Sequence, residues 1–203
     1  MRVGGIVLCG GRSSRMGRPK AWLPFGDELL LPRIVRILGE VVSPVVVVAA
    51  AGQDLPPLPP GVAVAFDEFP ERGPLQGLLA GLQHLEGRAD VAYVSACDAP
   101  LLRAAFVRGV IESLGMADAA VPDVEGQLHP LAAAYRVGSG LRAVRAAADR
   151  GRFAVRDLFV SLATNRLGRD ALARFDPGLE SLRTANTPAE FAQLLPSGGP
   201  SEP

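Results

Sequence analysis

The chain has 203 residues, a formal net charge of +0 and 48% hydrophobic residues, which fits one globular domain with a sizeable core. The balanced charge argues against a nucleic-acid binder, and the longest apolar run, residues 45–51, is too short to cross a bilayer. Two cysteines are too few for a disulfide framework, so we expect a reduced, cytoplasmic protein that binds neither nucleic acid nor membrane.

Short β-branched runs alternate with stretches of helical spacing along much of the chain. The expected strands are residues 5–8, 45–50, 62–66, 91–95, 119–122 and 129–135. The expected helices are residues 31–40, 75–85 and 101–114. Most of these strands are apolar throughout rather than alternating, so both of their faces should be covered.

This alternation predicts a single-domain, three-layer α/β sandwich over residues 1–195, with a mostly parallel sheet and helices on both faces. The polar, Gly/Pro-rich tail at 196–203 is predicted to be disordered. Ligands of such sheets bind outside the carboxyl ends of the strands. Attention therefore falls on the residues after Leu8, Phe66 and Ser95.

A glycine-rich basic loop follows the first strand, Leu8-Cys9-Gly10-Gly11 through Arg15 to Lys20, the only lysine of the chain. Paired glycines let the backbone approach a ligand closely, and two cations can hold phosphates. The loop has neither the Gly-Lys-Ser/Thr of a Walker loop nor a GxGxxG fingerprint, which makes a P-loop kinase a poor alternative.

The string Gly-Gly-x3-Arg-Met-Gly-x2-Lys resembles the signature loop of the Rossmann-like nucleotidyltransferases, and it is most similar to that of the molybdenum cofactor guanylyltransferases. The resemblance implies a fold like that of the nucleotide-diphospho-sugar transferases. It further implies nucleotide contacts from residues 8–11, and phosphate contacts from Arg15 and Lys20. Cys9 stands where the family has alanine.

The string Gly73-Pro74-Leu75-Gln76-Gly77 reads as a helix start, with Gly73 as N-cap and Pro74 in the first turn. Mid-helix glycines are costly, so Gly77 and Gly81 need a reason. We favour a ligand at Gly77, whereas ligand and tight helix–sheet packing are equally good explanations for Gly81. The family has a similar string near the base of the nucleotide.

Asp67 directly follows the third expected strand and matches a family position that binds guanine nucleotide. The competing interpretation is an ordinary solvated loop carboxylate.

Asp98 follows the fourth expected strand in a Cys-Asp-x-Pro string. It could cap the next helix, act as a general base, or hold a divalent metal over phosphates. The adjacent phosphate loop favours the metal, since Mg²⁺ takes one or two carboxylates plus substrate phosphates. The string also resembles the family's magnesium-binding aspartate, with Mn²⁺ a conceivable substitute. Cys97 lacks a partner base and is expected to be a small buried residue.

Two further residues come from the C-terminal part. His129 begins a His-Pro-Leu string that the family also carries, which implies a place at the acceptor site. The string Asn186-Thr187-Pro188-Ala189-Glu190 contains a capping box that leaves Asn186 unexplained. Related nucleotidyltransferases use an asparagine or aspartate here as a second metal ligand, and a purely structural Asn186 is an equal alternative.

The resemblance implies an enzyme that transfers GMP from GTP to the terminal phosphate of molybdopterin and releases pyrophosphate. Partners could include other cofactor-biosynthesis or apoenzyme-delivery proteins. Two alternatives stay open: a nucleotidyltransferase that uses CTP or another phosphorylated acceptor such as a sugar phosphate, and a non-catalytic nucleotide-binding protein. Gly10 favours GTP, because cytidylyl-transferring relatives often have alanine there. Residues 46–51 lack the asparagine that the family often carries.

Overall fold

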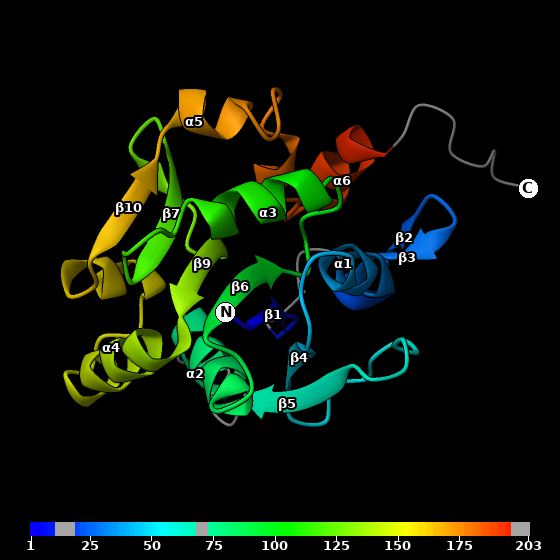
Figure 1. Cartoon of the computed structure of the whole chain (residues 1–203). Helices are drawn as coiled ribbons and strands as arrows, with labels where there is room; N and C mark the ends of the chain where they lie inside the picture. Colours follow the sequence, from blue (N-terminus) through cyan, green and yellow to red (C-terminus); the bar gives the residue numbers. More distant parts are fainter. Residues whose placement is uncertain (11–18, 68–72, 196–203) are drawn as a thin grey trace, which may run out of the picture.

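The structure, a computed structural model, describes residues 1–10, 19–67 and 73–195. Its main sheet has the strand order β10-β7-β9-β6-β1-β4-β5, with β8 paired to β7, and β2 and β3 form a separate hairpin (Figure 1). The strands are β1 Val3–Leu8, β2 Pro24–Phe25, β3 Glu28–Leu29, β4 Val45–Ala50, β5 Ala63–Asp67, β6 Val91–Ala96, β7 Ala119–Val124, β8 Gln127–Leu128, β9 Ala132–Arg136 and β10 Thr164–Leu167.

Helices cover both faces of this sheet, as the continuous apolar strands predict (Figure 1). One face packs against α1 (Leu30–Gly39), α3 (Ala104–Glu112), α5 (Arg169–Ala173) and α6 (Pro188–Leu194). The other packs against α2 (Pro74–Leu85), α4 (Val137–Asp149) and the 3-10 helix η3 (Val155–Val160). Short 3-10 helices η1 (Lys20–Trp22) and η4 (Glu180–Leu182) lie in the connections.

The directions of the strands determine which side of the sheet can bind a ligand. β1 pairs in parallel with β4 and β6, β4 with β5, and β7 with β10, so the predicted mostly parallel sheet is confirmed. β9 is antiparallel to both β6 and β7, with Ser95 opposite Ala132. The start of β9 therefore lies beside the carboxyl ends of the parallel strands, where ligands of such sheets bind.

Several predicted boundaries differ from the structure by one or two residues, and two element starts are wrong by three residues for local reasons. The strand expected from residue 129 begins at Ala132, because His129 and Pro130 form a turn in which the Ala132 N–H donates to the His129 carbonyl at 3.0 Å. The helix expected from residue 101 begins at Ala104, after a turn closed by the Leu102 N–H and the Ala99 carbonyl. The tail at 196–203 lies outside the described residues.

Within residues 1–10, 19–67 and 73–195, no helix combines the length and the apolar character that a membrane crossing requires.

Candidate nucleotide-binding site

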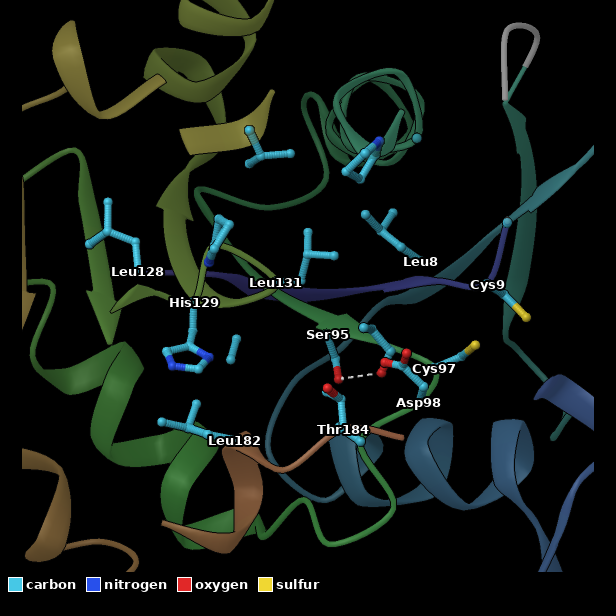
Figure 2. Close-up of a pocket in the computed structure, with 18 of the residues that line it drawn as sticks. Leu8, Cys9, Ser95, Cys97, Asp98, Leu128, His129, Leu131, Leu182 and Thr184 are labelled. Carbon is cyan, nitrogen blue, oxygen red and sulfur yellow. Dashed lines mark hydrogen bonds between the residues drawn. The ribbon is translucent and has the colours of Figure 1, made fainter. Parts of the chain in front are cut away.

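A pocket of about 970 Å³ opens at this edge of the sheet (Figure 2). It collects the candidate residues that lie far apart in sequence. Those that line it are Leu8, Cys9, Gly10, Lys20, Asp67, Gly73, Pro74, Gly77, Asp98 and His129. Gly11 and Arg15 lie outside the described residues. Asn186 does not line the pocket itself but contacts Lys20, which does.

The centre of the site is a lysine between two oxygen ligands. Lys20 Nζ donates to Asp98 Oδ2 at 2.6 Å and to Asn186 Oδ1 at 3.0 Å. The Lys20 and Asp98 side chains are only 18% and 17% exposed, so their attraction is weakly screened by solvent. Three separate segments thus supply oxygen and ammonium groups to one point, which is an arrangement suited to a polyphosphate and its counter-cation.

Backbone hydrogen bonds hold Asp98 in this position. The Cys97 N–H donates to the Leu8 carbonyl at 3.0 Å, and the Ala185 N–H donates to the Asp98 carbonyl at 3.3 Å. The capping alternative is wrong, because α3 begins at Ala104 with Arg103 as its N-cap. The Asp98 carboxylate is therefore directed to Lys20 and the pocket rather than to a helix end.

The predicted N-cap at Thr187 is confirmed, but the Glu190 carboxylate bonds to Asn186 rather than to the N-cap N–H that a full capping box requires. The Glu190 N–H donates to Thr187 Oγ1 at 3.2 Å, while Glu190 Oε2 accepts from the Asn186 N–H at 2.8 Å. The bond from Glu190 fixes the backbone of Asn186, while the side-chain oxygen of Asn186 accepts the hydrogen bond from Lys20. The described ranges contain no cluster of three or more His, Cys, Asp and Glu that could hold a metal. Asp98 and Asn186 offer one side-chain oxygen each to Lys20, and Mg²⁺ typically needs only one or two protein carboxylates besides substrate phosphates and waters.

Asp67 lies at the end of β5 and is only 6% exposed, which contradicts the interpretation as a solvated loop carboxylate. A Cβ on Gly77 would lie 3.6 Å from Asp67 Oδ2, so the carboxylate lies against the first turn of α2. Gly73 is the N-cap of this helix with φ of 83°, a left-handed conformation that favours glycine. The helix start and Asp67 together form one wall of the pocket.

The two mid-helix glycines have different reasons. A Cβ on Gly81 would lie 2.6 Å from Ile6 Cγ2 in the core, so packing requires glycine there. A Cβ on Gly77 would meet its nearest described neighbour, Leu8 Cδ2, at an ordinary 3.5 Å, so packing alone does not require glycine. Gly77 also lines the pocket.

Replacing each of these two glycines with alanine tests whether packing or a ligand requires it. We expect Gly81→Ala to destabilise the protein by about 1–2 kcal/mol, because overpacking against Ile6 exceeds the gain in helix propensity. Gly77→Ala should leave thermal unfolding nearly unchanged and raise the KM for the nucleotide, because its methyl group enters the pocket. Thermal unfolding and steady-state kinetics of both variants check this. A Gly77→Ala variant with an unchanged KM would remove the nucleotide from this wall.

Cys97 is confirmed as a small buried residue. It is 6% exposed. Its hydrogen bond with Cys9 and, to a smaller extent, its burial raise the pKa of its thiol. The thiol therefore remains protonated and is a poor nucleophile. Sequence reasoning missed Gln53. Its side-chain amide donates to the Cys9 carbonyl at 3.1 Å, and its Oε1 accepts from the Ala50 N–H at 3.1 Å. Gln53 therefore ties the start of the basic loop to β4.

His129 faces the pocket from the turn before β9, near Leu182 (Figure 2). Burial lowers the pKa of its imidazole, so the ring is neutral at pH 7. Sequence reasoning missed several polar residues that line the pocket, among them Tyr93, Ser95 and Thr184. Tyr93 and Ser95 alternate along β6, and Cys97 continues this spacing one residue beyond the strand, so strand periodicity could have placed them on one face.

The mostly parallel sheet, the pocket at its carboxyl edge and the lysine–carboxylate pair define a Rossmann-like nucleotidyltransferase. Residues 5–165 match the model of the MobA-like NTP transferase domain, and the chain belongs to this family.

This chain is similar to one curated protein in sequence and to two solved structures in fold, among others. The "Probable molybdenum cofactor guanylyltransferase" of Mycobacterium tuberculosis is 40% identical over 161 residues, 72% of this chain and 79% of that protein. Molybdopterin-guanine dinucleotide biosynthesis protein A from Archaeoglobus fulgidus superposes with a TM-score of 0.76 at 19% identity, over 94% of this chain and 96% of that one. The 2-C-methyl-D-erythritol 4-phosphate cytidylyltransferase from Thermus thermophilus gives 0.67 at 17% identity, over 96% and 97%. These structural likenesses establish the shared fold.

Proposed function

We propose that this protein transfers GMP from GTP to the terminal phosphate of molybdopterin, releasing pyrophosphate and forming the guanine dinucleotide cofactor. The observation that carries this proposal is the meeting of Lys20, Asp98 and Asn186 near the carboxyl ends of the parallel strands. The relative from Mycobacterium tuberculosis supports the choice of nucleotide and acceptor by its name. We further propose that the enzyme acts in the cytoplasm and passes its product to other cofactor-biosynthesis or apoenzyme-delivery proteins.

The chemistry needs positioning and charge neutralisation more than proton transfer. An oxygen of the acceptor phosphate attacks the α-phosphorus of GTP in line, and the bond to the pyrophosphate oxygen breaks. The attacking oxygen is already anionic, so the reaction requires no general base, and we assign that role to no residue. Lys20, together with Arg15, would neutralise charge on the phosphates.

Asp98 and Asn186 are the residues that would hold Mg²⁺, with Mn²⁺ as a substitute. Their fit is supported by the ammonium of Lys20, which already brings both side-chain oxygens to a single cation at 2.6 and 3.0 Å. When bound, the ion supplies Lewis-acid stabilisation of the phosphate charges. Binding of Mg²⁺ requires Lys20 to share these oxygens or to turn toward the phosphates.

The other wall of the pocket supports a guanine nucleotide. Leu8, Gly10 and the start of α2 leave room for the nucleoside, and Asp67 presents a carboxylate there. A carboxylate can accept from the N1–H and the N2 amino group of guanine, an arrangement that cytosine does not offer. This favours GTP over CTP.

Product analysis tests the choice of nucleotide and acceptor. The protein is incubated with molybdopterin, Mg²⁺ and equal concentrations of GTP and CTP, and the dinucleotide products are separated by chromatography. We expect the guanine dinucleotide to predominate. A cytosine product in equal or greater amount would overturn the assignment of GTP, and transfer to a sugar phosphate in preference to molybdopterin would overturn the acceptor.

A further inference from the structure

One pocket-lining residue, Tyr93, has a buried hydroxyl without a partner among the described residues. Tyr93 is 0% exposed and lines the pocket, and its Oη makes no hydrogen bond within the described residues. Tyr135 is equally buried, but its hydroxyl donates to the Pro130 carbonyl at 2.8 Å. Buried hydroxyls are nearly always paired, because an unpaired one loses its bonds to water without compensation. The orphaned hydroxyl of Tyr93 therefore points to a ligand atom that completes it.

The strand pattern shows which ligand can reach it. Tyr93 packs with Cys97 in the core on the α1 and α3 side of the sheet. Leu8 and Val48, whose side chains lie nearest to the place that a Cβ on Gly77 would take, pack on the opposite, α2 side. The pocket wall at the start of α2, where we place the nucleotide, and Tyr93 thus lie on different faces of the sheet. The part of the pocket near Tyr93 is the place left for the acceptor.

The surroundings indicate the chemistry of that acceptor. Ser95, Thr184, His129 and Leu182 converge on one hollow beyond Asp98 (Figure 2). Apolar walls with polar groups among them suit a flat heterocycle that carries ring nitrogen and carbonyl atoms. Ser95 Oγ already donates to the Ala96 carbonyl at 3.1 Å, so its hydrogen is partly engaged. Tyr93 is the deeply buried donor that remains.

We propose that Tyr93 is a specificity-determining residue whose hydroxyl donates a hydrogen bond to a ring oxygen or nitrogen of the phosphorylated pterin acceptor. This inference rests on the proposed function. Burial raises the pKa of the Tyr93 phenol, so the group stays protonated and can donate at neutral pH. A site built around such a donor rejects analogues that cannot accept the bond.

The test is Tyr93→Phe, which removes the hydroxyl and keeps the ring. We expect the KM for molybdopterin to rise about tenfold, in line with the loss of one buried hydrogen bond, with the KM for GTP unchanged. Without ligands, thermal unfolding of this variant should equal or exceed that of the wild type, since no protein bond is lost. Tyr135→Phe is the matched comparison and should unfold at a lower temperature, because its hydroxyl bond is satisfied.

The outcomes separate this inference from the proposed function. An unchanged KM for molybdopterin in Tyr93→Phe, with an active wild type, would overturn the role of Tyr93 and leave the function intact. A rise in both KM values would also overturn it, because the hydroxyl would then serve the site in general. A wild type that does not turn over molybdopterin would remove the proposed function and the role of Tyr93 together.

Discussion

Replacing Asp98 with alanine is expected to lower pyrophosphate release about a thousandfold or more, with the fold intact. The substitution removes the carboxylate that pairs with Lys20 at 2.6 Å and that would hold the divalent cation. The fold should survive, because the backbone bonds of Asp98 remain and Lys20 keeps its bond to Asn186. Steady-state pyrophosphate release and thermal unfolding measure the two effects.

The matched control is Asp149→Ala, an exposed carboxylate at the end of α4 that does not line the pocket. It removes the same charge and should leave turnover unchanged. Titration of Mg²⁺ sharpens the test, since the residual activity of Asp98→Ala should require much more of the ion. Near-normal pyrophosphate release by a folded Asp98→Ala variant would remove the metal role from this residue.

Replacing Lys20 with arginine is expected to lower kcat about a hundredfold without unfolding the protein. The ammonium donates to two oxygens on different segments from a single atom, at 2.6 and 3.0 Å. A planar guanidinium keeps the charge but spreads its donors in a fixed fork, so it cannot place one nitrogen at the same point. The loss should appear mainly in kcat, since the interaction with the phosphates strengthens as charge moves to the leaving group.

Arg145→Lys is the control for this exchange of cations. Arg145 is exposed on α4, with a distant 4.0 Å pair to Glu86, and the swap there should change neither turnover nor stability measurably. Full activity of Lys20→Arg would show that any cation suffices. The only lysine among 21 basic residues would then reflect the arginine-rich composition alone.

The parts of the fold that follow from local pattern could be predicted. Continuous apolar runs such as Val45–Ala50 indicate strands covered on both faces, and the structure confirms this. The direction of β9 could not be predicted, because its short run of small residues carries no signal for parallel or antiparallel pairing. That direction decides the site, since it brings His129 to the same edge as Asp98.

The candidate site divides in the same way. Lys20 and Asp98 belong to strings with recognisable spacing, and the structure brings them together, whereas their roles remain predictions. The contact of Asn186 with Lys20 joins positions 166 residues apart, and no local pattern encodes it. Tyr93 was missed because a buried aromatic residue on a strand is ordinary in sequence. Only the packed structure shows that its hydroxyl lacks a partner in the part of the chain that the structure describes.

Acceptor-dependent pyrophosphate release tests the central claim most directly. The purified chain is assayed with GTP and Mg²⁺, with and without molybdopterin, while GTP binding is measured in parallel. We predict GTP binding in both cases and release of one pyrophosphate per dinucleotide formed only when the acceptor and the ion are both present. GTP binding without release in the complete mixture would instead show a non-catalytic nucleotide-binding protein and contradict the account.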